Sequence, residues 1–92
     1  MKALVCEKGK FKSKKGEEYF TCILTAYNDF TKDYRIVSVK DSSTGKYVPK
    51  RFFVPEKVYE SIFVGHVFDF TFVANPQTGV SSIDDVKPAK FD

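Results

Sequence analysis

The sequence has no tryptophan, one methionine and one histidine, and it contains little proline or glycine. Four Pro and five Gly among 92 residues, beside 16% aromatic residues, exclude a disordered or low-complexity chain. Its apolar runs are a few residues long, far short of the roughly 18–20 that span a bilayer. Glu7 and Lys8 interrupt the first apolar segment before a signal peptide develops. We expect a single domain over residues 1–92, located in the cytoplasm and without a membrane partner.

Residues suited to catalysis or metal binding are also scarce. His66 is the only histidine, and Cys6 and Cys22 lack the spacing of a metal site. Asp84 and Asp85 are neighbours on an expected strand and should point to opposite faces, so they cannot share a metal ion or a proton. Phosphate-binding loops and nucleophile motifs are absent from the sequence. We therefore predict no metal, no cofactor and no enzymatic activity. Reduced, buried cysteines are expected, with a single disulfide left open.

Alternating side chains predict an all-β protein with one short helix. The expected strands are residues 2–7, 18–27, 34–40, 47–54, 67–74 and 80–86, and residues 11–17, 41–46 and 75–79 are expected turns. Pro49 indicates that the fourth strand lies at a sheet edge. The helix is expected over residues 55–63, with Pro55 at its first position. Its apolar stripe is Val58, Tyr59, Ile62 and Phe63. Residues 88–92 are expected to form a tail.

This order of elements matches a five-stranded Greek-key barrel of the oligonucleotide-binding (OB) fold type. Such barrels often carry a helix between their third and fourth strands, and here residues 34–54 would form a hairpin that counts as the third. We therefore predict a single OB-like domain with extended β-hairpin wings.

Lysine-rich hairpin tips flank the strands that carry tyrosines. The net charge of +3 is small, but Lys8 to Lys15 includes five lysines and no acid. Basic side chains neutralise phosphates, and aromatic rings stack on unpaired bases. Each feature alone is typical of a solvated turn or a half-buried sheet, whereas their combination indicates a nucleic-acid-binding surface. The candidate binding residues are Phe11, Lys12, Lys15, Tyr19, Tyr27, Tyr34, Lys46 and Arg51.

Two segments resemble the single-stranded DNA-binding proteins of filamentous phages, the gene V product type. Ser13-Lys14-Lys15-Gly16-Glu17-Glu18-Tyr19 is similar to the basic wing of that family, and Tyr27 and Tyr34 follow at the family's intervals of eight and seven residues. Gly79, Ile83-Asp84 and Lys87-Pro88-Ala89-Lys90 are similar to its closing strand and terminus. The sequence differs at Thr78 and Asp85, where the family has an aromatic and a basic residue. Residues 55–63 are longer and more helical than the family's corresponding stretch.

The resemblance implies a barrel that dimerises and coats single-stranded DNA without sequence preference, in phage or plasmid DNA replication. Its location would then be the cytoplasm of a bacterial host. Tyr19, Tyr27 and Tyr34 would lie at the DNA surface, although one of them packing at a dimer contact stays open. Lys14 and Lys87 stand where the family has arginines, and they complete the set of candidate binding residues.

Other partners and functions stay open at this point. RNA is an alternative ligand, which would make the chain an RNA-binding OB module. A small β-barrel adaptor or inhibitor of phage origin is another alternative, and it would use the face of Phe68, Phe70 and Phe72 to bind a protein. For a homodimer, the edge over residues 47–54 and the apolar Ile23 and Ile36 are compatible with a second copy.

Overall fold

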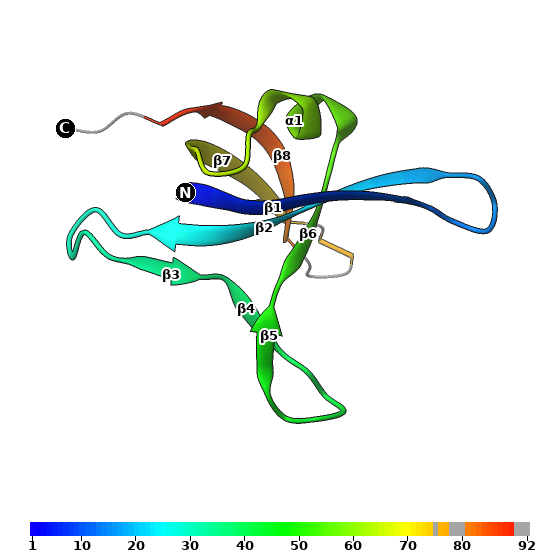
Figure 1. Ribbon diagram of the computed structural model, residues 1–92, viewed down its shortest axis with the longest axis horizontal. Coiled ribbons are helices and arrows are strands. Elements are labelled where there is room, and N and C mark those ends of the chain that lie inside the picture. The colour runs from blue at the N-terminus through cyan, green and yellow to red at the C-terminus, as the bar shows by residue number, and fades with distance from the viewer. Residues whose placement is uncertain (75, 78–80, 90–92) are drawn as a thin grey trace.

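The computed structural model describes residues 1–74, 76–77 and 81–89, and it is an antiparallel β-structure with one short helix (Figure 1). The elements are β1 (Lys2–Lys12), β2 (Glu18–Tyr27), β3 (Tyr34–Ile36), β4 (Ser38–Lys40), β5 (Tyr47–Pro49), β6 (Arg51–Val54), α1 (Glu56–Ser61), β7 (Val67–Ala74) and β8 (Ser81–Pro88). The predicted all-β class with one helix is therefore confirmed. Thr78, Gly79 and Lys90, which entered the family resemblance, lie outside the described residues.

The strands form a six-stranded sheet and a separate two-stranded hairpin. The main sheet has the order β3-β2-β1-β7-β8, and β6 also pairs with β2. β3 pairs with residues 25–27 of β2 and β6 with residues 20–23, so the two strands share one edge of β2. β4 and β5 pair only with each other. Within the described part of the chain, no ladder joins β8 to β3 or β6 to close a barrel.

The first hairpin is longer than predicted. β2 and β7 have the predicted bounds, but β1 continues past residue 7 to Lys12 and pairs as far as Lys12 with Glu18. Phe11 and Lys12 are therefore strand residues, and the predicted turn shrinks to Ser13–Glu17, where Gly16 has a φ of 84°. The ladder satisfies the backbone groups of these polar residues, so their charge does not end the strand.

The predicted strands over residues 34–40 and 47–54 are each interrupted. The Val37 amide donates to the Leu24 carbonyl (2.9 Å), and the Val37 carbonyl accepts from the Lys50 amide (2.8 Å). β3 and β6 therefore stay with the main sheet, while β4 and β5 leave it as a projecting arm (Figure 1). Pro49 lies in this arm, opposite Ser38, in keeping with its predicted edge position.

The helix is shorter than predicted and is anchored from β1. Pro55 is its N-cap and not its first helical residue, and the backbone is extended again at Ile62. Val58 and Ile62 are buried as the stripe predicts, whereas Phe63 is exposed, contrary to the prediction. The Lys8 ammonium donates to the Ile62 carbonyl (2.9 Å) and lies 4.1 Å from the centre of the Tyr59 ring. Lys8 therefore ties the end of α1 to β1.

One core lies between the sheet and the helix. Its buried members are Ala3, Val5, Cys22, Leu24, Phe52, Val54, Val58, Ile62, Phe70 and Ile83, with Phe68 and Phe72 packed against them. The three phenylalanines of β7 are thus part of the core, which weakens their prediction as a protein-binding face. Both cysteines are free, but only Cys22 is buried, so the expectation of a buried thiol is wrong for Cys6.

Two further features concern the ends of the chain and the membrane. β8 extends through Pro88, so Lys87 and Pro88 belong to the last strand, and the expectation that Pro88 lies in a tail is wrong. In the described ranges, no helix has the length and apolar character needed to cross a membrane.

Candidate nucleic-acid interface

The strands β1, β2, β3 and β6 turn one face away from the core, which we call the outer face. Residues paired directly across an antiparallel ladder share a face, so the register defines its members. Successive rows are Phe11–Tyr19, then Gly9–Thr21–Phe53, then Glu7–Ile23–Arg51, then Thr25–Ile36, and finally Tyr27–Tyr34. The outer face therefore carries aromatic residues at both ends and an arginine between them.

Three rings form a cluster on the first hairpin, which we call the hairpin cluster. Phe11 and Tyr19 stack with centroids 5.3 Å apart and planes inclined by 26°. Phe53 meets both rings edge-on, at 6.2 Å from Phe11 and 6.1 Å from Tyr19. All three side chains are exposed. Rings gathered in this way offer a stacking surface to a flat ligand.

Phe53 is the functional candidate that the sequence prediction missed. Phe52 and Val54 on either side of it are buried, whereas Phe53 is 56% exposed. The alternation of a strand would have placed it opposite Phe52. The contact with Phe11 and Tyr19 could not be foreseen, because it depends on β6 pairing with β2.

Two tyrosines form the second cluster, at the other end of β2. The rings of Tyr27 and Tyr34 are 4.9 Å apart with planes inclined by 47°. Beside them is a pocket of about 600 Å³ around the turn between β2 and β3, with Tyr27, Phe30 and Arg35 in its lining. Tyr19 and Tyr27 are eight residues apart on one strand. The two clusters are therefore separated by about 26 Å, at about 3.3 Å per strand residue.

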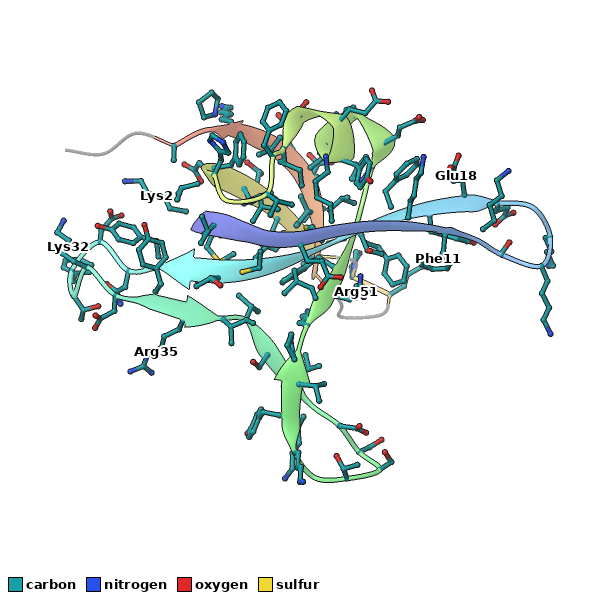
Figure 2. The ribbon with its side chains drawn as sticks, viewed as in Figure 1. Lys2, Phe11, Glu18, Lys32, Arg35 and Arg51 are labelled. Carbon is teal, nitrogen blue, oxygen red and sulfur yellow. The ribbon has the colours of Figure 1, made fainter. Side chains whose placement is uncertain are left out.

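Arg51 lies between the clusters (Figure 2). Its Nη1 donates to the Thr21 hydroxyl at 3.2 Å, and its Nη2 is 3.8 Å from a carboxylate oxygen of Glu7. The Thr21 hydroxyl in turn donates to the Gly9 carbonyl at 3.2 Å. The guanidinium group is thus held over the middle of the outer face with part of its surface open to solvent.

The lysines of the hairpin are distributed differently from the prediction. Lys12 pairs with Glu18, and its row faces the side opposite Phe11 and Tyr19. Lys12 therefore lies on the other side of the hairpin from Phe11 and Tyr19. Lys14 and Lys15 are exposed in the turn at the far end of the hairpin, beyond the hairpin cluster.

The remaining predicted cations lie away from the hairpin cluster. Lys46 lies in the connection between β4 and β5, which form a separate sheet. Lys87 on β8 pairs with Asp69, which pairs with Lys2 on β1 and accepts from the N-terminal ammonium at 3.0 Å. The structure therefore brings Phe11, Tyr19 and Arg51 together and leaves Lys46 and Lys87 apart from them.

An acidic residue also contacts the hairpin cluster. The Tyr19 hydroxyl donates to a carboxylate oxygen of Glu17 at 2.6 Å. This hydrogen bond, together with the negative charge of Glu17, raises the pKa of Tyr19 above its ordinary value. Tyr19 therefore keeps its neutral ring at physiological pH.

Comparison with known proteins adds no relative to these observations: no protein family, curated protein or solved structure matches the chain. In the part of the chain that the structure describes, no three His, Cys, Asp or Glu side chains are grouped to hold a metal ion. The candidate site therefore consists of the two ring clusters, Arg51 between them, and Lys14 and Lys15 in the turn beyond the hairpin cluster.

Proposed function

We propose that this chain is a non-catalytic protein that binds single-stranded nucleic acid, DNA foremost, with little dependence on sequence. The observation that supports this most is the outer face itself, with ring clusters at both ends and Arg51 between them; only Tyr27 among these rings is half-buried, and the others are exposed. Every base has a face that stacks on an aromatic ring, so such a surface accepts any sequence. A duplex keeps its bases stacked inside and would bind more weakly.

In this proposal the rings and the cations have separate tasks. Bases stack on the hairpin cluster and on Tyr27 and Tyr34, while the phosphates between them meet Arg51. Lys14 and Lys15 extend the positive charge beyond one end of the face and attract the strand from a distance. The separation of the clusters, about 26 Å, is that of several nucleotides, within the site sizes known for OB-type modules.

The finer fold and the family belong to the same proposal. We infer that the sheet, with α1 between β6 and β7, is an OB-like barrel related to the gene V type of phage protein. Under this proposal the chain acts in phage or plasmid DNA replication in a bacterial cytoplasm. A second copy of the chain would pair through the β4–β5 arm.

A titration with poly-dT tests the binding function. Tryptophan is absent, so tyrosine fluorescence can be followed, and three of the five tyrosines, Tyr19, Tyr27 and Tyr34, lie on the proposed surface. We expect quenching whose apparent affinity falls steeply between about 50 and 200 mM salt. Matched titrations with poly-U and with duplex DNA separate the RNA-binding and duplex-binding alternatives. Absence of quenching and of a mobility shift at low salt, in a folded sample, would refute the proposal and favour the protein-adaptor alternative.

Two phenylalanines provide a matched pair of variants. Phe53 is 56% exposed in the hairpin cluster, and Phe63 is 60% exposed after the helix. Each substitution therefore removes a phenyl ring that is exposed to solvent to a similar degree. We expect Phe53→Ala to weaken poly-dT binding roughly 5- to 100-fold, the loss of one stacked base. Phe63→Ala should leave the affinity unchanged. Equal effects of the two variants would mean that the outer face is not the binding surface.

A further inference from the structure

Gly9 occupies a position on the outer face where a side chain would press closely against the arginine. A Cβ atom at Gly9 would lie 3.1 Å from Arg51 Nη1 and 3.1 Å from Thr21 Oγ1. Its backbone is not in the left-handed region, unlike that of Gly16, Gly45 and Gly65. Glycine is therefore not required at this position for a turn. What it provides is space beneath the guanidinium group.

The polar groups around this space hold the guanidinium in place. Thr21 is only 1% exposed, and its hydroxyl donates to the Gly9 carbonyl, which leaves the oxygen lone pairs to accept from Arg51. The Glu7 carboxylate, at 3.8 Å, attracts Nη2 without a close hydrogen bond. Arg51 is thus oriented through Nη1, while its other donors remain toward solvent or toward Glu7. Glu7 and Gly9 come from β1, Thr21 from β2 and Arg51 from β6, so three strands build the arrangement.

The row of Gly9 also contains Phe53, which lies two residues along β6 from Arg51 and on the same face. A base stacked on Phe53 would bring its phosphate toward Arg51. An arginine fork suits this contact because its planar donors match two phosphate oxygens at once, which a lysine ammonium cannot do.

We propose that Gly9 is a positioning residue, whose missing side chain lets Arg51 lie over the middle of the outer face and bind a backbone phosphate of the strand. This inference rests on the proposed function, and it adds a residue that makes no contact with the ligand itself. Gly9 acts on binding only through Arg51.

A double-mutant cycle tests this dependence. The variants are Gly9→Ala, Arg51→Ala and the double variant, each titrated with poly-dT at several salt concentrations. We expect Arg51→Ala to weaken binding about tenfold, the loss of one charge-assisted contact. Gly9→Ala should weaken binding by part of that amount, because its Cβ shifts the guanidinium group without removing it. The slope of log K against log salt should fall by about 0.7 in Arg51→Ala, one phosphate contact on a single strand, and by less in Gly9→Ala. In the Arg51→Ala background, Gly9→Ala should have no further effect.

Additional variants keep the test decisive if Gly9→Ala impairs folding. Arg51→Lys retains the positive charge and leaves Gly9 in place, but it removes the planar guanidinium group. Its affinity for poly-dT should fall nearly as far as that of Arg51→Ala. Lys10→Ala, on the opposite face of the same hairpin, is the control and should lose little affinity for poly-dT. Wild-type protein that fails to bind poly-dT would refute the proposed function and this inference together. Wild-type binding with additive effects of Gly9→Ala and Arg51→Ala, or with Arg51→Lys equal to wild type, would refute the inference alone.

Discussion

The two cysteines differ in the surroundings of their thiols. Cys22 is fully buried in the core, and this burial raises the pKa of its thiol to about 11, with Lys8 opposing the shift. Cys6 is exposed at the irregularity in β1 and contacts the Thr25 hydroxyl at 2.7 Å. Because the thiolate is the reactive species, both burial and the raised pKa protect Cys22.

We therefore expect a thiol reagent at about pH 8 to modify one cysteine in the folded protein and two after unfolding. With a thiol reagent that releases a coloured product, the absorbance of that product gives the number of thiols that have reacted. Cys6→Ser should remove the fast reaction, and Cys22→Ser should leave its rate unchanged. Two thiols reacting at the same rate under native conditions would contradict the placement of Cys22.

Single residues also mark the boundary of what the sequence can predict about the site. Tyr19, Tyr27 and Tyr34 are recognisable because each lies on a strand with clear alternation. Gly9 carries no such signal: its role depends on Arg51, which is 42 positions away and becomes a neighbour only when β6 pairs with β2. Contacts across non-consecutive strands are not encoded in local periodicity.

At the scale of elements, periodicity predicts those strands whose two sides differ. β7 alternates between core phenylalanines and other residues, and its predicted bounds are correct. The outer half of β1 has charged residues on one side and no buried residue, so hydrophobic alternation cannot mark it as a strand. The interruption at Val37 is equally hidden, because residues 34–40 alternate without a break while the backbone changes its partner from β2 to β5.

The junction of β1 with α1 gives a prediction about stability. Lys8 and Lys10 lie on the same face of β1. The ammonium of Lys8 donates to the last turn of the helix and lies over Tyr59, while that of Lys10 is 3.9 Å from the exposed carboxylate of Glu18. We expect Lys8→Ala to lower the free energy of unfolding by about 1–2 kcal/mol, because a partly buried, charged hydrogen bond and a cation–π contact are lost.

Lys10→Ala is the matched control, since it removes the same charge from the same face. Lys10→Ala should change the free energy of unfolding by no more than about 0.5 kcal/mol, as for other exposed ion pairs. Urea unfolding followed by circular dichroism measures both variants. If the two lysines contribute equally, Lys8 does not anchor the helix.

On the scale of the whole molecule, the β4–β5 arm receives the least support from the other elements of the fold. It stands away from the main sheet (Figure 1) and pairs with no third strand among the described residues. An isolated two-stranded hairpin is marginally stable in water. The arm nevertheless exposes Val39, Val48 and Tyr47, the last at 74%. Of the two isoleucines predicted to face a partner, Ile36 is exposed, but Ile23 is buried within the chain itself.

These features are the basis of the proposed second copy, and they lead to a prediction about mass in solution. We expect sedimentation equilibrium to give twice the chain mass of 10.5 kDa. Tyr47→Glu should shift the protein toward the monomer, because a carboxylate placed in an apolar contact is costly to desolvate. Phe63→Glu, which alters an exposed aromatic residue elsewhere, should leave the mass unchanged.

Dimerisation and binding are then coupled through the number of outer faces that one particle presents. A dimer can hold one strand at two faces, so its apparent affinity for long poly-dT should exceed that of the Tyr47→Glu monomer, while both bind a short oligonucleotide equally. A wild-type monomer at tens of micromolar, or a Phe63→Glu variant that also dissociates, would show that the arm is not the contact. Loss of short-oligonucleotide binding in Tyr47→Glu would instead place Tyr47 in the nucleic-acid surface.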